Sequence, residues 1–94
     1  MTFMKDETLL TTLEETARKL SIQLEYDDLK KGAVDTPGGL FTLKGERRIL
    51  LHKGLSPRER VRALTELLAA QDIESVHIPV EVRELLENER EKGG

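Results

Sequence analysis

The segment from Ser56 to about Gln71 carries the most complete helix signal in the chain and constrains the fold most strongly. Ser56 is a favoured N-cap residue, Pro57 suits the first helical position, and Glu59 completes a capping box. At about 100° per residue, the aliphatic side chains of this segment fall on one side of the helix. They are Val61, Leu64, Leu67 and Leu68. A helix with one apolar face needs a second layer to cover it.

Two other segments have helical spacing, and one has the two-residue period of a strand. Residues 6–20 begin with acids and end near bases, which complements the helix dipole, and Pro79 opens a last helix. Residues 21–29 place Ile22, Leu24 and Tyr26 on one face of a short strand. The apolar positions that define the two helices are Leu9, Leu10, Leu13, Ala17 and Leu20 in the first, and Val82, Leu85 and Leu86 in the last.

Residues 40–43 and 48–52 read as a hairpin around a turn at Lys44-Gly45-Glu46. The continuous apolar run at residues 49–51 predicts a central strand that is partly covered on both faces. Thr36-Pro37-Gly38-Gly39, just before the hairpin, has the composition of a turn, and we expect the glycine pair to belong to it.

The order of these elements predicts an α+β fold of the type α-β-β-β-α-α. Its simplest packing is a small three-stranded, mostly antiparallel sheet covered by helices. The order does not decide whether the first strand joins the hairpin at its edge. With 94 residues, the chain is expected to form a single domain over residues 1–94, with frayed ends at about 1–5 and 91–94.

Composition excludes several classes of protein. The chain has 37% hydrophobic and 35% charged residues, a balance typical of globular domains, and it has no cysteine. Disulfides and thiolate metal sites are therefore excluded. No apolar run approaches the ~20 residues that cross a bilayer, and the N-terminal segment has no signal-peptide core. We expect a cytoplasmic protein that does not contact membranes.

The net charge of −3 is unevenly distributed along the sequence. Residues 44–62 carry seven bases and two acids, whereas the segments on either side are acidic. Opposite segments could neutralise each other within the fold or across a dimer, or the basic segment could bind an acidic partner such as nucleic acid. The overall acidity argues against general phosphate binding. The candidate partner-binding residues are Lys44, Arg47, Arg48, Lys53, Arg58 and Arg62.

Residue types that carry catalysis are sparse. His52 and His77 are the only histidines, and neither has a local partner at metal-ligand spacing. Nothing in the sequence predicts a cofactor, a metal site, a nucleophile elbow or a phosphate-binding glycine loop.

Two stretches nevertheless resemble a known family. "KLSIQLEYDDL" is followed by "GGLFTLKGERRILLHKGLSPRERVRALTELLA". Together they are similar to the front half of the ImmA/IrrE-like zinc metallopeptidases, over roughly residues 8–72. In that family an N-terminal helix, a short strand and a hairpin lead into a capped helix with an H-E-x-x-H motif. The resemblance implies a zincin-like front half.

The sequence departs from the family at this motif. The H-E-x-x-H window falls on residues 65–69, so Glu66 matches the general base, while Thr65 and Ala69 replace the two zinc-binding histidines. The resemblance therefore implies a scaffold without catalysis, with Thr65, Glu66 and Ala69 as a remnant cleft. The residues alone also allow a plainer role for Glu66, as a solvent-exposed partner of Arg62 one helical turn earlier.

Three functional hypotheses follow. We favour a non-catalytic protein that acts through protein–protein contact or regulation, with an unknown protein partner or as a homodimer. The first alternative is a nucleic-acid-associated module that uses residues 44–62. The second is an atypical metal-dependent peptidase that uses His52, His77 and Glu66.

Overall fold

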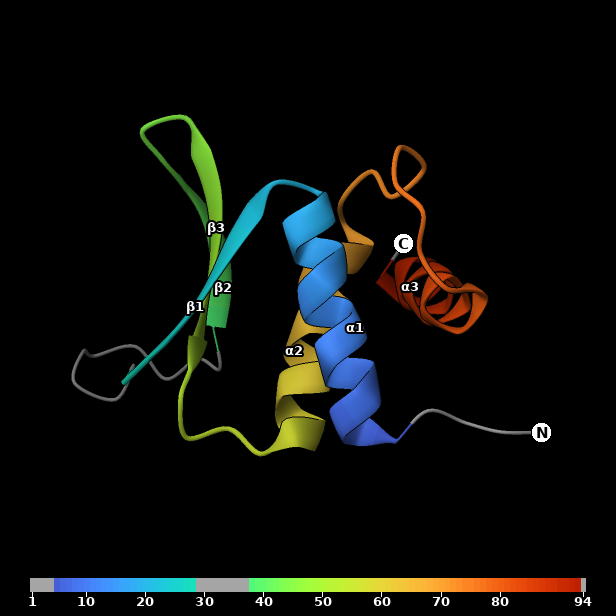
Figure 1. Cartoon of the computed structure of the whole chain (residues 1–94), viewed down its shortest axis with the longest axis horizontal. Helices are drawn as coiled ribbons and strands as arrows, with labels where there is room; N and C mark the ends of the chain where they lie inside the picture. The colour runs from blue at the N-terminus through green and yellow to red at the C-terminus, as the bar shows by residue number, and fades with distance from the viewer. Residues whose placement is uncertain (1–4, 29–37, 94) are drawn as a thin grey trace.

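The computed structural model describes residues 5–28 and 38–93, and it confirms the expected α+β order α-β-β-β-α-α (Figure 1). The fraying expected at the chain ends is not tested. Residues 1–4 and 94 lie outside the described part, and residues 91–93 belong to the last helix. The elements are α1 (Asp6–Lys19), β1 (Ile22–Asp27), β2 (Gly38–Leu43), β3 (Glu46–His52), α2 (Pro57–Ala69) and α3 (Val80–Gly93).

The three strands form one mixed sheet in the order β1-β3-β2. β2 and β3 make the expected antiparallel hairpin, with Leu43 opposite Glu46 beside the turn. β1 does join the hairpin, and it pairs in parallel with β3, from Ile22 opposite Arg47 to Asp27 opposite His52. The expected central strand is thus β3, which has a neighbour on each side.

The hairpin turn contains only Lys44 and Gly45, because Glu46 already belongs to β3. Both turn residues have positive φ, 52° at Lys44 and 82° at Gly45. Two successive left-handed residues give a type I′ turn, whose twist matches that of the two strands it joins. Glycine tolerates this conformation at no steric cost, which explains its place at the second position.

The prediction of a turn at residues 36–39 is wrong for Gly38 and Gly39. Thr36 and Pro37 lie outside the described residues, but Gly38 and Gly39 begin strand β2. A Cβ atom on Gly38 would lie 2.3 Å from the carbonyl oxygen of Leu50 in the neighbouring strand. Gly38 therefore permits the close approach of two backbones, which is a recognised use of glycine inside a strand.

The described elements stack as the sheet, then α1 and α2, then α3 (Figure 1). α1 lies against β1, α2 lies against α1 and also contacts β2, and α3 packs mainly on α2. The side chains that point from the sheet toward the helices alternate along β3, where Ile49 and Leu51 have no exposed surface. The other fully buried aliphatic side chains are Leu13, Leu64, Leu68, Ile73, Val82 and Leu86.

The predicted N-terminus of α2 is confirmed in detail. The backbone N–H of Glu59 donates to the Ser56 hydroxyl over 3.2 Å, and the backbone N–H of Ser56 donates to the Glu59 carboxylate over 2.9 Å. The Ser56 backbone N–H, and to a smaller extent the Ser56 side chain, hydrogen-bond to the Glu59 carboxylate and lower its pKa below the ordinary value. The capping box thus fixes where the chain leaves β3 and enters the second layer.

Two arginines connect the layers at the other end of the helices. Arg47 donates to the carbonyl of Leu20, after α1, over 2.6 Å and to the side chain of Gln71, after α2, over 2.7 Å. Arg90 of α3 donates to the carbonyls of Ala69 and Gln71 over 2.9 and 2.7 Å. α2 has no basic residue in its own last turn, so Arg90 supplies the positive charge that a helix C-terminus favours.

No helix in the described residues is long and apolar enough to cross a membrane.

Replacing Gly38 by alanine tests the close approach between β2 and β3. The added methyl group would overlap the Leu50 carbonyl and approach the Leu51 side chain, so we expect Gly38→Ala to lower the free energy of unfolding by about 1–3 kcal/mol. Urea unfolding followed by circular dichroism measures the change. Gly39→Ala is the matched control, because no atom lies within 4 Å of its added Cβ. Equal stability of the two variants would contradict the proposed contact.

Candidate functional site

The helix window at residues 65–69, where the resemblance expects the zincin motif, is split between the interior and the surface. Thr65 and Ala69 are each only 4% exposed, whereas Glu66 points to solvent. Arg62 and Glu66 form the expected ion pair over 3.7 Å, with side chains that are 85% and 54% exposed. Thr65 lines a shallow hollow of about 440 Å³ between α2 and α3, and Glu66 is not part of it. The three residues therefore do not line one cleft.

The donor atoms in this window do not fit a zinc ion. The Thr65 hydroxyl donates to the carbonyl of Val61 over 2.7 Å, and the Ala69 side chain has no donor atom. Zinc sites in proteins use imidazole, thiolate or carboxylate ligands, and only Glu66 offers one, on the opposite, exposed side. Among residues 5–28 and 38–93, no group of three or more histidine, aspartate or glutamate side chains could hold a metal ion.

His52 and His77 lie on different parts of the fold, at the end of β3 and in the loop before α3. His52 is the last residue of β3, and its Nδ1 lies 3.3 Å from the carbonyl oxygen of Asp27. His77 lies near the end of α1, because its carbonyl accepts a hydrogen bond from the Lys19 ammonium over 2.7 Å. The structure therefore does not bring together the histidines on which the peptidase hypothesis depends.

The basic residues of segment 44–62 do not form one surface. Arg47 points toward the helices, and its neighbour Arg48 points to the other side of the sheet, where it pairs with Glu25 over 2.9 Å and with Glu46 over 3.4 Å. Arg60 donates to the carbonyls of Leu55 and Lys53. The remaining members are exposed, on the hairpin turn, the loop after β3 or α2. They are Lys44, Lys53, Arg58 and Arg62.

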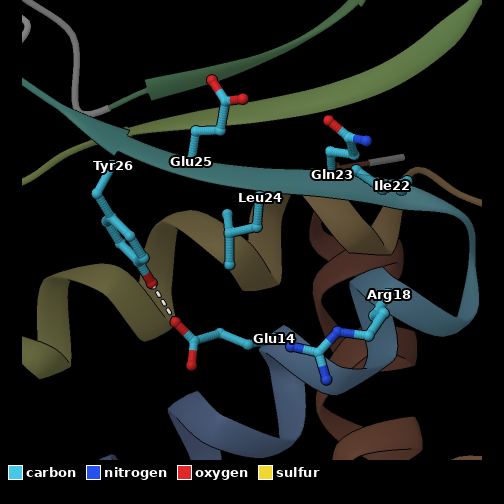
Figure 2. Close-up of a pocket in the computed structure, with 7 residues that line it drawn as sticks. All are labelled: Glu14, Arg18, Ile22, Gln23, Leu24, Glu25 and Tyr26. Atoms are coloured by element: carbon cyan, nitrogen blue, oxygen red, sulfur yellow. Dashed lines mark hydrogen bonds between the residues drawn. The ribbon is translucent and has the colours of Figure 1, made fainter.

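A polar hollow of about 420 Å³ lies between α1 and the free edge of β1 (Figure 2). Tyr26 points from β1 toward α1, and its hydroxyl donates a short hydrogen bond to the carboxylate of Glu14. The guanidinium of Arg60, from α2, lies 4.6 Å from the centre of the Tyr26 ring. Three elements thus meet at this tyrosine.

These surroundings decide what the Tyr26 hydroxyl can do. Burial, followed by the hydrogen bond to Glu14 and the charge of that carboxylate, raises the pKa of Tyr26 well above its ordinary 10.0, although Arg60 acts in the opposite direction. The phenol therefore stays protonated at neutral pH and cannot serve there as a general base. Its role is to join β1 to α1.

The most distinctive surface is the side of the sheet that faces away from the helices, which we call the outer face. No described helix covers it (Figure 1). β2 presents Phe41 and Leu43 on this face, and their side chains are 41% and 46% exposed. The half-buried Leu50 of β3 is on the same face, because it alternates with the buried Ile49 and Leu51. It lies opposite Gly39 and therefore diagonal to Phe41.

Within the described residues, β1 and β2 are the two edge strands of the sheet, and they differ in charge. On the outer face β1 carries Gln23, Glu25 and Asp27, which are all exposed. β2 reads GGLFTL and has no charged side chain along its six residues. Charged residues are a common protection of edge strands against pairing with other chains, so β1 is protected and β2 is not.

The hairpin was expected from the sequence, but the exposure of Phe41 and Leu43 on the outer face was not. The signal was present, because Leu40 and Phe41 are neighbours and both are apolar. In a sheet covered on one side, two adjacent apolar residues cannot both be buried, so one of them must lie on the open face.

No family model matches this sequence, no curated protein is significantly similar to it, and no solved structure matches it. Functional inference therefore rests on the geometry of the chain itself.

The raised pKa of Tyr26 predicts a loss of stability in alkali. The folded state favours the protonated phenol, so this contribution is fully present below pH 10.0 and is lost as the pH rises further. We expect the free energy of unfolding to fall more steeply above that pH in the natural chain than in Tyr26→Phe. Tyr26 is the only tyrosine and there is no tryptophan, so phenolate absorbance reports its titration directly. An ordinary midpoint in the folded chain would contradict the assignment.

Introducing histidines at positions 65 and 69 should damage the fold rather than build a metal site. Thr65 and Ala69 are buried, so the double variant Thr65→His/Ala69→His overfills the contacts of α2 and should lower stability by about 1–3 kcal/mol per site. Thermal unfolding with and without zinc measures the change in stability. Glu66→His is the control at an exposed position, and its free energy of unfolding should lie within about 0.5 kcal/mol of that of the natural chain. Strong stabilisation of the double variant by zinc would show that the window can still form a site.

Proposed function

We propose that this chain is a non-catalytic, zincin-like protein that acts by binding another protein chain through β2. The binding surface consists of the free edge of β2 together with Phe41, Leu43 and Leu50 of the outer face. We call it the β2 surface.

The non-catalytic part is supported by the chemistry of the helix window. The order of helix, strand, hairpin and capped helix agrees with the front half of the ImmA/IrrE-like metallopeptidases. At the positions of the zinc-binding histidines, however, the chain has a hydroxyl bonded to its own helix and a buried methyl group. Glu66 could not activate a water molecule without a metal beside it.

The binding part is supported above all by the exposed apolar residues of an uncharged edge strand. Among the described residues, three large apolar side chains are exposed: Phe41, Leu43 and Val80. Phe41 and Leu43 both lie on β2. An apolar patch beside unpaired backbone donors and acceptors is what recognition by strand addition requires, because the backbone gives affinity and the side chains give specificity.

Photo-crosslinking in cells tests this proposal. A photoreactive phenylalanine analogue at position 41 should form covalent adducts with a protein chain on irradiation, because it replaces an aromatic residue of the β2 surface. The same analogue at position 66 should form few or none, since Glu66 lies on the solvent side of α2. Adducts are detected by gel shift and identified by mass spectrometry.

Two outcomes would count against the proposal. Adducts at position 66 without adducts at position 41 would move the binding surface to the helix window. The absence of adducts at position 41, in a chain with unchanged thermal stability, would remove the β2 surface altogether.

A further inference from the structure

We infer that the chain bound at the β2 surface is a second copy of this protein, paired antiparallel through β2 to give a continuous six-stranded sheet. This inference rests on the proposed function and specifies its partner. It follows from the hydrogen-bond pattern of β2, from the distribution of charge and from the symmetric pairing that two copies of this strand allow.

The hairpin register determines which backbone groups of β2 are free. Leu43 and Glu46 flank a two-residue turn, so they exchange both backbone hydrogen bonds. Because hydrogen-bonded and non-hydrogen-bonded pairs alternate in an antiparallel ladder, Phe41 is also bonded to β3. Leu40 and Thr42, on either side of Phe41, form the non-hydrogen-bonded pairs with Ile49 and Arg47. Their N–H and C=O groups therefore point away from β3, toward the outer edge of β2.

A twofold axis at Phe41 satisfies these groups with a second copy. Leu40 of each chain would face Thr42 of the other, and both residues have outward N–H and C=O groups. Phe41 would face Phe41 of the second copy in a non-hydrogen-bonded pair, where side chains are closest. The exposed aromatic ring of each chain would thus be covered by its counterpart on the outer face.

Charge favours this pairing over the other symmetric arrangement of the sheet. Pairing of two copies through β1 would bring Glu25 and Asp27 of both chains together, and like charges directly opposite destabilise a strand pair. β2 is uncharged from Gly38 to Leu43, so two copies of it meet without repulsion. An isologous contact of this kind closes on itself, as in most homodimers.

Single cysteines test the register directly, because the natural chain has none. In Phe41→Cys the two thiols would face each other across the axis in a non-hydrogen-bonded pair, at a Cα separation of about 4.5 Å that a disulfide can span. Mild oxidation of the purified chain should give at least tenfold more covalent dimer for Phe41→Cys than for Gln23→Cys. Gln23 is an exposed residue of the other edge strand, so Gln23→Cys controls for random collision. Equal yields would overturn the inference.

Sedimentation of the natural chain, which keeps its Phe41 ring, provides an independent measurement. We expect the mass to rise with concentration from 10.7 kDa toward twice that value. Thr42→Pro removes an N–H that points away from β3, so it should spare the hairpin and abolish the rise. A natural chain that remains a monomer at millimolar concentration would overturn the inference. Adducts between position 41 and a different protein in cells would then preserve the proposed function alone.

Discussion

The parallel pairing of β1 with β3 determines the rest of this structure. β2 lies between β1 and β3 in the sequence, yet β3 pairs with both β1 and β2. β3 is therefore the central strand, and β2 lies at the edge. The pairing also sets the direction in which the chain leaves the sheet. β3 ends beside the end of β1, and the capping box at Ser56 turns the chain back along α1 as α2. A meander, in which β2 paired with both β1 and β3, would have placed β2 in the middle of the sheet and left it without a free edge.

The inner side of the sheet is occupied by α1 and α2, and α3 adds its apolar face to these helices rather than to the sheet. In the described residues, the third helix thus does nothing to cover the outer face. Burial is concentrated between the helices and one side of the strands, where most of the fully buried side chains lie. The exposed Phe41 and Leu43 are a direct consequence of how the three layers are divided.

Local chemistry made much of the fold predictable. The capping box, the helical and two-residue periods and the hairpin turn all depend on residues close in sequence, and the structure confirms each of them. The direction of β1 and the role of Gly38 depend on contacts between distant strands, so no local pattern could give them. The basic segment looked like a surface because its charges are adjacent in sequence. Strand alternation places Arg47 and Arg48 on opposite sides of the sheet. In α2, the turn of the helix likewise separates the buried Thr65 from the exposed Glu66.

The charges on β1 have a consequence for how far such an assembly could extend. If two chains join through β2, the six-stranded sheet ends in two copies of β1, and each presents Glu25 and Asp27 along its border. These carboxylates repel a further strand of the same kind. In such a dimer, growth would stop at two subunits, because the acidic strand at each end of the sheet would prevent the uncharged strand from seeding a fibre.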